Sequence, residues 1–266
     1  MCRLYGVTRG GYYAWRSRGL SDRRKEDLGL KEWVKVLYER SHGIYGAPRI
    51  QANLVSIDKH HSKKRIARLM VEGGLEGRCM RIYRSNRGHA AHCRNIDHAS
   101  LDGVDGPNQA WVGDVTYIKV CGQWHYLAVV MDWFTRRIVG WSLGDRRTVA
   151  LTLRALNQAV RNRCPDQSII FHSDRGVEYI GNAFRNRLKR LGFIQSVNRL
   201  NRMNDNARME SFFGSLKSEW LYGLRFDTVG ALRGRIESYM PFYNQQRMHS
   251  SLEYMAPATY EESFNN

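Results

Sequence analysis

Three acidic residues stand where their carboxylates could act together on a phosphate. Asp114 lies in the middle of an apolar, strand-like segment, where Asp is disfavoured. Asp174 comes just after a second apolar segment, and Glu210 follows in a helical one. Carboxylate oxygens are ligands that Mg²⁺ and Mn²⁺ prefer. Two such ions about 4 Å apart activate an attacking oxygen and stabilise a leaving one. The three acids therefore indicate a candidate two-metal site for phosphoryl transfer.

Each acid also has an ordinary interpretation. Taken alone, Asp174 is more often a turn or helix-capping residue, Asp114 a solvent-facing strand residue, and Glu210 a helix-surface acid. Asp132, near the end of the apolar segment 124–133, is a rival metal ligand. We favour a turn role for Asp132, because "DWFTRR" bridges two strand-like segments and Asp suits the start of a turn.

The helix around Glu210 shows which of its side chains share a face. A helix turns by about 100° per residue, so Lys217, seven residues later, lies at about 700°, on nearly the same face. Glu219 lies nine residues later, at about 900°, on the opposite face. We therefore expect Lys217 to meet a phosphate held at the site, and Glu219 to point away from it.

The elements that must position these residues follow one another in a recognisable order. Three strand-like segments with short connections predict an antiparallel meander, and a helix, a strand, a helix, a strand and two long helices come after it. This is the element order of an α/β ribonuclease H-like domain, in which the first and fourth strands are neighbours. Element order alone supports this fold only weakly. The predicted bounds are 111–120, 124–133, 136–143, 148–163, 168–172, 181–191, 193–198, 205–222 and 228–246.

The charge of the chain points to a polyanionic partner. The 266 residues carry a formal net charge of +17, and residues 1–100 hold 21 Lys and Arg against 9 Asp and Glu. Nucleic acid is the first candidate and an anionic membrane surface the second. Membrane association is disfavoured, since no apolar run approaches the roughly 18 residues of a membrane helix. The scattered cysteines form no CxxC pair, which disfavours a structural zinc site, and the cytoplasm or nucleoid is the expected location.

The basic first 84 residues are expected to be helical and smaller than the domain that follows. Apolar residues recur there with the helical period, at Leu30, Trp33, Val34, Leu37 and Tyr38. Segment 62–74 predicts a second, basic helix that begins after Ser62 as N-cap. Its basic side chains are Lys63, Lys64, Arg65 and Arg68. They either form an ordinary solvated face or contact the DNA backbone. The clustering of positive charge favours DNA contact.

Five blocks, in order, resemble one family. They are "WVGDVTYI", "VVMDWFTRRIVGWS", "FHSDRGVEY", "DNARMESFFGSLKSE" and "YNQQRMHSSLEYMAPATYEE". Together they resemble the second-frame (OrfB) transposases of the insertion-sequence-three family, DDE enzymes related to retroviral integrases. The acids fall on Asp114, Asp174 and Glu210, with 35 residues between the last two, and Lys217 also matches.

The resemblance implies a ribonuclease H-like catalytic domain over 108–266, after a DNA-binding region over 1–84 and a linker over 85–107. It implies Mg²⁺-dependent cleavage and joining of transposon ends, with transposon-end and target DNA as partners. It also implies a bacterial host, and a first-frame (OrfA) product or frameshift fusion that supplies the main end-recognition module. Because paired ends usually require a multimer, we expect a homo-oligomer on DNA.

Two other functions remain open at this point: a structure-selective nuclease of the same fold, and a non-catalytic DNA-binding regulator or transposon relic. The final block argues against the nuclease, and the intact acid triad against the relic. In that block, Arg247 and His249 lie in a polar break after the last long helix. They either contact DNA or hold the C-terminal tail on the core.

Overall fold

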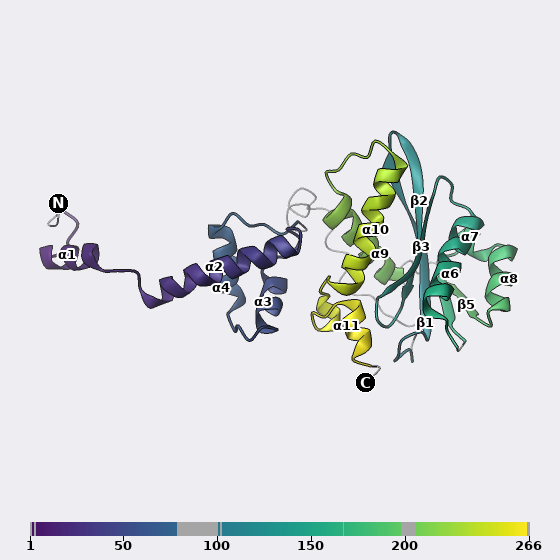
Figure 1. The fold of residues 1–266 in the computed structure, drawn as a ribbon, viewed down its shortest axis with the longest axis horizontal. Helices are drawn as coiled ribbons and strands as arrows, with labels where there is room; N and C mark the ends of the chain where they lie inside the picture. The colour runs from purple at the N-terminus through teal and green to yellow at the C-terminus, as the bar shows by residue number, and fades with distance from the viewer. Residues whose placement is uncertain are drawn as a thin grey trace. The chain divides into compact units, whose positions relative to one another are not determined.

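The computed structural model describes residues 2, 4–78, 101, 103–166, 168–197 and 206–264. The chain divides into two compact units, Met1–Gly77 and Arg78–Asn266, each described by itself (Figure 1). The predicted linker, 85–107, falls largely outside the described residues, so its bounds and those of the regions on either side stay predictions.

The N-terminal unit is helical, as the apolar periodicity predicts. Its packed helices are α2 (Asp22–Arg40), α3 (Ala47–Val55) and α4 (Lys63–Glu72), and α1 (Arg9–Ser17) precedes them without burying a side chain. Ser62 caps α4, because its hydroxyl accepts the Arg65 N–H at 3.2 Å. The buried residues are Leu30, Val34 and Leu37 from α2, Ile50 and Leu54 from α3, and Ile66, Leu69 and Met70 from α4. Trp33, one of the five predicted apolar positions, is 43% exposed.

The C-terminal unit is built on a five-stranded sheet in the order β3-β2-β1-β4-β5. The predicted antiparallel meander consists of β1 (Ala110–Val120), β2 (Gln123–Asp132) and β3 (Ile138–Gly144). Parallel to β1 runs β4 (Ile170–Ser173), and β5 (Ile194–Val197) runs parallel to β4. This mixed sheet, with the first and fourth strands adjacent, confirms the ribonuclease H-like fold.

Helices cover both faces of the sheet (Figure 1). On one side lie α6 (Val149–Arg163), α7 (Val177–Ile180) and α8 (Asn182–Arg190). The other side holds α9 (Ala207–Ser215), α10 (Val229–Gln245) and α11 (Pro257–Glu262). Between α9 and α10 comes the π-helical segment η2 (Leu216–Leu221), and the 3₁₀ turn η3 (Ser250–Leu252) precedes α11. The sequence pattern predicted α9 and η2 as one helix and did not predict α7 or α11; α1 lies in the first 84 residues, which were expected to be helical.

Two glycines allow close packing around the strands that carry the site. A Cβ on Gly140 of β3 would lie 2.7 Å from the Ala159 backbone nitrogen of α6, so a larger residue would push the helix away. A Cβ on Gly113 of β1 would lie 2.6 Å from the Phe171 ring of β4. Gly113 therefore lets the buried Phe171 ring lie beside β1, one residue before Asp114. The core on the α6 side includes Trp111, Ala128, Val130, Leu151, Leu156, Ile169, Phe171, Tyr179, Phe184 and Leu188.

Candidate active site

Strand register brings Asp114 and Asp174 to the same point of the sheet. β1 and β4 pair in parallel, and the last matched residues are Gly113 and Ser173. β4 ends at Ser173, whereas β1 continues to Val120. The two aspartates are the next residues along neighbouring strands, which lie about 4.8 Å apart in a sheet. The predicted juxtaposition of the two aspartates is therefore present.

Asp114 sits in an environment that disfavours its charge. The pKa of this carboxyl is raised to about 7, mainly by burial, with smaller upward contributions from the carboxylates of Asp174 and Glu210. Two groups act the other way: the Val115 N–H, which Asp114 accepts at 2.7 Å, and the Arg147 guanidinium. Adjacent carboxylates repel each other unless one takes a proton or a cation lies between them. The site is thus poised to accept positive charge.

Asp174 combines two of the roles that its sequence position allows. Its Oδ1 accepts the Gly176 N–H at 2.9 Å, which is the turn contact expected of an aspartate after a strand. Its Oδ2 lies 3.5 Å from Arg147 Nη2, and its side chain is 36% exposed. A capping role and a place at the acid cluster are therefore compatible in one residue.

An ion pair that the sequence did not reveal, between exposed Arg147 and buried Glu178, lies beside Asp174. The Glu178 side chain is 1% exposed, and its Oε1 accepts from Arg147 Nε at 2.6 Å and lies 2.5 Å from Nη2. A Cβ on Gly176 would come within 2.6 Å of Glu178 Oε1. No sequence signal joins Arg147 to Glu178, because 31 positions separate them. Arg147 thus places its charge between a buried acid and a candidate catalytic acid.

Glu210 and Lys217 reach the site from the α9 side. Glu210 is exposed in the first turn of α9, and its charge contributes to the raised pKa of Asp114. Lys217 is half-buried, with its Nζ 5.0 Å from the centre of the Tyr117 ring. Burial lowers the pKa of Lys217, and the nearby Asp114 opposes that shift. Both side chains are therefore within electrostatic reach of Asp114, as the shared helical face predicts.

The donor chemistry of the acid cluster suits a hard divalent cation. Asp114, Asp174 and Glu210 offer only carboxylate oxygens, the ligand type that Mg²⁺ and Mn²⁺ take. In the described part of the chain, no three His, Cys, Asp or Glu side chains converge closely enough to hold a metal ion.

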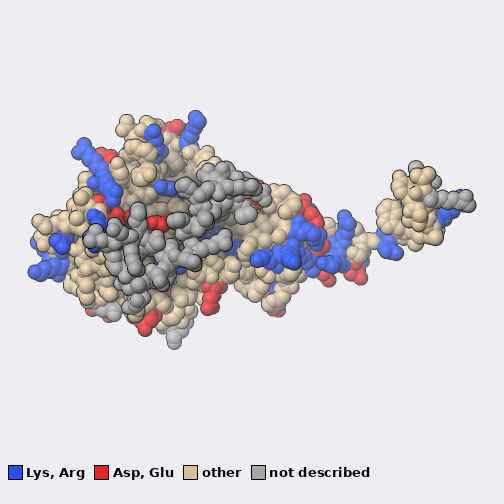
Figure 2. Space-filling model, turned by 180° about the vertical axis from the view of Figure 1, so that it is seen from behind, with Lys and Arg blue, Asp and Glu red and all other residues tan. Residues whose placement is uncertain are grey.

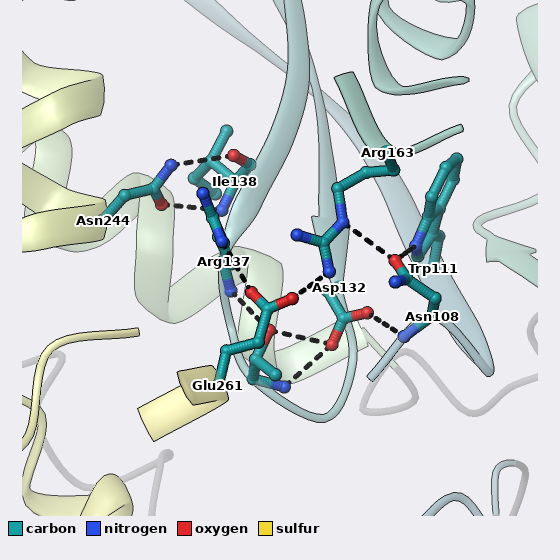
Figure 3. A network of polar contacts seen from close by, with 9 residues as sticks. Asn108, Trp111, Asp132, Arg137, Ile138, Arg163, Asn244 and Glu261 are labelled. Atoms are coloured by element: carbon teal, nitrogen blue, oxygen red, sulfur yellow. Dashed lines mark hydrogen bonds and ion pairs between the residues drawn. The ribbon is translucent and has the colours of Figure 1, made fainter. Parts of the chain in front are cut away.

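The rival ligand, Asp132, has a turn role. It is fully buried, and its carboxylate accepts the N–H of Thr135 at 2.8 Å, the Thr135 hydroxyl at 2.9 Å and the N–H of Asn108 at 2.7 Å (Figure 3). These three donors occupy both carboxylate oxygens. The prediction of a turn residue at this position is confirmed.

Arg247 and His249 were candidate DNA contacts, and this assignment is corrected. Both are buried, with 4% and 7% of their surface exposed. Arg247 donates to both oxygens of Glu219 at 2.6 Å and to Ser215 at 2.9 Å. The His249 ring packs at 4.8 Å on the ring of Tyr243. Their alternative role, holding the C-terminal tail on the core, is what the contacts show, and Glu219 points away from the acid cluster as expected.

The basic side chains of α4 were expected to remain mostly solvated, and this holds for only some of them. Arg65 donates from Nε to Asp27 at 2.6 Å, and Arg68 binds the other oxygen of Asp27 at 2.6 Å. The Arg65 side chain is 17% exposed, so it is not solvated as predicted. Lys63 and Lys64 are exposed. On the face of this unit seen in Figure 2, Lys and Arg atoms lie beside Asp and Glu atoms.

None of the helices in the described ranges combines the length and the apolar character needed to cross a bilayer.

Family models match most of the chain. An HTH-like domain model matches residues 24–83, one integrase core domain model matches 104–202, and a second matches 210–264. The HTH-like match overlaps the helices α2 to α4, and the two integrase core matches contain all three acids.

Curated relatives span nearly the same length. The chain is 37% identical over 272 residues to the insertion element IS600 uncharacterized 31 kDa protein of Shigella sonnei, covering 100% of this chain and 98% of that protein. It is 33% identical over 267 residues to transposase InsF for insertion sequence IS3A of Escherichia coli (strain K12), with 98% and 92% covered.

Among solved structures, the chain resembles a cryo-EM structure of a simian T-cell lymphotropic virus intasome in complex with PP2A regulatory subunit B56 gamma. The TM-score is 0.53 at 17% identity, over 86% of this chain and 74% of that chain. At this identity the likeness concerns the fold.

Proposed function

Since the chain belongs to the integrase-core transposases of the IS3 family, we propose that Asp114, Asp174 and Glu210 are the catalytic acids of this polynucleotidyl transferase. The observation that carries the assignment is the β1–β4 register, which ends at Gly113 and Ser173 and leaves the two aspartates adjacent. The raised pKa of Asp114 supports it: burial is the main cause, and the charges of Asp174 and Glu210 add to it, so both acids lie within electrostatic reach of Asp114.

Asp114, Asp174 and Glu210 would together hold one or two Mg²⁺ or Mn²⁺ ions through their carboxylate oxygens. Such ions polarise the phosphate and activate the attacking oxygen in an in-line displacement. The chain contributes positioning and charge, so no Tyr or Ser nucleophile is invoked. Asp114 must ionise before it can bind a cation, which its raised pKa makes dependent on pH near neutrality.

Two cations next to the acids have distinct roles in this proposal. Arg147 stays anchored to Glu178 and offsets the charge of Asp174 until a metal ion arrives. Lys217 extends over the Tyr117 ring, half-buried, and holds a phosphate of the DNA at the site. Burial lowers its pKa and Asp114 offsets that shift only in part, so a phosphate beside Lys217 would favour its charged form.

DNA is the proposed partner, as transposon ends and as target. Exposed Lys63 and Lys64 of α4 contact the DNA backbone, whereas Arg65 and Arg68 mainly hold α4 against Asp27 of α2. We further propose a homo-oligomer on DNA, an OrfA product or frameshift fusion as the protein partner, and action at the bacterial nucleoid in the cytoplasm. The working domain division is a DNA-binding region over 1–84, a linker over 85–107 and the catalytic domain over 108–266.

Asp174→Asn tests the site. The variant should bind transposon-end DNA like the wild-type chain and lose metal-dependent cleavage, because the amide keeps the turn contact to Gly176 but cannot share a cation. Asp166→Asn, at an exposed position before β4, is the matched control and should cleave normally. Normal cleavage by Asp174→Asn would show that the assignment is wrong.

A strand-transfer assay with a labelled 3′-hydroxyl end separates joining from hydrolysis. The transposase proposal expects the labelled strand to be covalently joined to target DNA in the presence of Mg²⁺. Hydrolysed product alone, under conditions where the ends are cut, would favour a nuclease of the same fold.

A further inference from the structure

The connection between β2 and β3, residues 132–137, is held rigidly by its surroundings; we refer to it as the β2–β3 turn. Asp132 accepts from Thr135, and Arg137 donates to Glu261 of α11 at 2.9 Å (Figure 3). The next residue, Ile138, exchanges two backbone hydrogen bonds with the Asn244 side chain, each at 2.8 Å. These contacts tie the turn to both α10 and α11.

Aromatic packing fixes the tip of the β2–β3 turn as well. The Phe134 ring lies 5.7 Å from Tyr260 and 4.9 Å from Phe264. The guanidinium of Arg208, from α9, stacks 3.9 Å above the Trp133 ring and also donates to the Trp133 carbonyl. The turn and the start of α9 are thus joined through Arg208.

Arg136 is the exception in this turn. It is half-buried, yet within the described ranges its side chain forms no hydrogen bond or ion pair. Its backbone has a φ of +59°, a left-handed conformation that residues other than Gly, Asn and Asp seldom adopt. Burial lowers the pKa of Arg136; Tyr243 opposes that shift and Arg247 adds to it. A rigid, strained turn therefore presents a cation for which the described residues supply no counter-ion.

Arg208 donates to the Trp133 carbonyl, but among the described residues it has no ion-pair partner either. The pKa of Arg208 is lowered to about 10, mainly by burial and also by the charge of Arg136, while Asp132 and Tyr260 act the other way. Its Nε is buried and, in the part of the chain that the structure describes, has no hydrogen-bond partner. Arg247, the third arginine of the group, is neutralised by Glu219. Among the described residues, two neighbouring guanidinium groups are thus partly desolvated and form no ion pair, which is unfavourable unless an anion binds them.

We propose that Arg136 and Arg208 form a binding site for a backbone phosphate of DNA. Guanidinium groups match phosphate oxygens with paired N–H donors, and Arg136 is held ready by the rigid turn. The site itself rests on the two arginines; that its anion is a DNA phosphate rests on the proposed function.

The position of the β2–β3 turn relative to Asp114 indicates which phosphate of the DNA Arg136 and Arg208 would bind. The Trp133 N–H donates to the Ala110 carbonyl at 2.9 Å, and Asp114 lies four residues further along β1. Four strand residues span about 13 Å. That length corresponds to about four nucleotides along a DNA duplex. The bound phosphate is therefore not the scissile one but lies a few nucleotides from it, and it fixes the register of the strand.

Arg136→Gln tests the site without removing a contact that supports the fold. Thermal unfolding is measured with and without inorganic phosphate, and binding of a transposon-end duplex is measured over a range of salt concentrations in EDTA, where no cleavage occurs. Without phosphate the variant should melt at or above the wild-type temperature, since an uncompensated cation is gone. Phosphate should raise the melting temperature of the wild-type chain more than that of the variant.

The binding of the transposon-end duplex should show the loss of one phosphate contact. Arg136→Gln should weaken DNA binding several-fold and reduce the slope of log K against log salt by about one. Arg136→Lys should retain part of the DNA binding, because lysine keeps the positive charge but lacks the paired N–H donors of the guanidinium group. Arg161→Gln, an exposed arginine of α6 on the other side of the sheet, is the matched control and should leave affinity and melting temperature unchanged.

A lower melting temperature for Arg136→Gln with unchanged DNA affinity and salt slope would overturn the proposal in favour of a structural role. Equal stabilisation of wild-type chain and variant by phosphate would overturn it too. A wild-type chain that shows the Arg136-dependent phosphate effect but binds no DNA would overturn the assignment of the anion to DNA. If the variant loses DNA binding but the wild-type chain never performs strand transfer, the phosphate site is supported and the proposed function fails.

Discussion

Replacing Arg247 with methionine tests whether this arginine stabilises the fold or contacts DNA. Its side chain is 5% exposed and that of Glu219 is 0% exposed, and two hydrogen bonds of 2.6 Å join them. Burial alone would lower the pKa of Arg247, but Glu219 raises it above the ordinary value. Methionine fills a similar volume without charge, so the change leaves the Glu219 carboxylate buried without its cation.

The expected loss is large because the remaining charge has no access to water. Breaking a buried ion pair by removing one partner costs about 3–5 kcal/mol. A typical domain has a free energy of unfolding of about 5–15 kcal/mol, so the variant should lose roughly a fifth of it or more. Replacing both partners, Arg247→Met with Glu219→Leu, should recover most of the loss, because no buried charge remains.

Urea unfolding at pH 7, followed by circular dichroism, measures these differences. Arg225→Met, at an exposed position after η2, should change the free energy of unfolding by less than about 0.5 kcal/mol. Below its unfolding transition, Arg247→Met should bind DNA with the salt dependence of the wild-type chain. A loss of stability under about 1 kcal/mol, together with weaker DNA binding, would refute the structural role.

Three further predictions follow from the site and the core. Because the folded pKa of Asp114 is about 7, above its unfolded value, ionisation destabilises the metal-free fold increasingly as pH rises from about 4 to 7. The free energy of unfolding of Asp114→Asn, measured in EDTA, should therefore exceed that of the wild-type chain by a margin that grows with pH. The margin should be roughly 2–3 kcal/mol larger at pH 8 than at pH 5. A margin that does not grow with pH would contradict the raised pKa. Lys217→Ala should weaken binding of a transposon-end duplex and lower its salt slope by about one, measured by fluorescence anisotropy; an unchanged slope speaks against a phosphate contact. Gly140→Ala should destabilise by about 1–3 kcal/mol in urea, because its Cβ meets the α6 backbone, whereas Gly234→Ala, with open space inside α10, should stabilise by up to about 1 kcal/mol.

Local patterns in the sequence predicted the elements well. The apolar period of 30–38 corresponds to α2, Ser62 caps α4 as expected, and the meander has the predicted order. These features depend on backbone periodicity and on contacts within one turn of helix, so neighbouring residues are enough to specify them. The short helices α7 and α11 have too few turns to show a period, and they were missed.

Pairing between distant residues was decided by the tertiary structure. Arg65 meets Asp27 across 38 positions, Arg147 meets Glu178 across 31, and Arg247 meets Glu219 across 28. The sequence marks these arginines as cations but not as partners of particular acids. Charge clustering therefore favoured DNA contacts at residues that the fold uses for ion pairs.

The acid cluster shows the division most clearly. By itself, the sequence determined which three carboxylates are candidates, because an Asp within an apolar strand and the interval from Asp174 to Glu210 are visible in it. Only the tertiary structure decided that β1 and β4 pair with Gly113 opposite Ser173, which leaves Asp114 and Asp174 side by side. Register depends on how the side chains of both strands pack against the helices, and a shift of one residue would turn every side chain of a strand to the other face of the sheet.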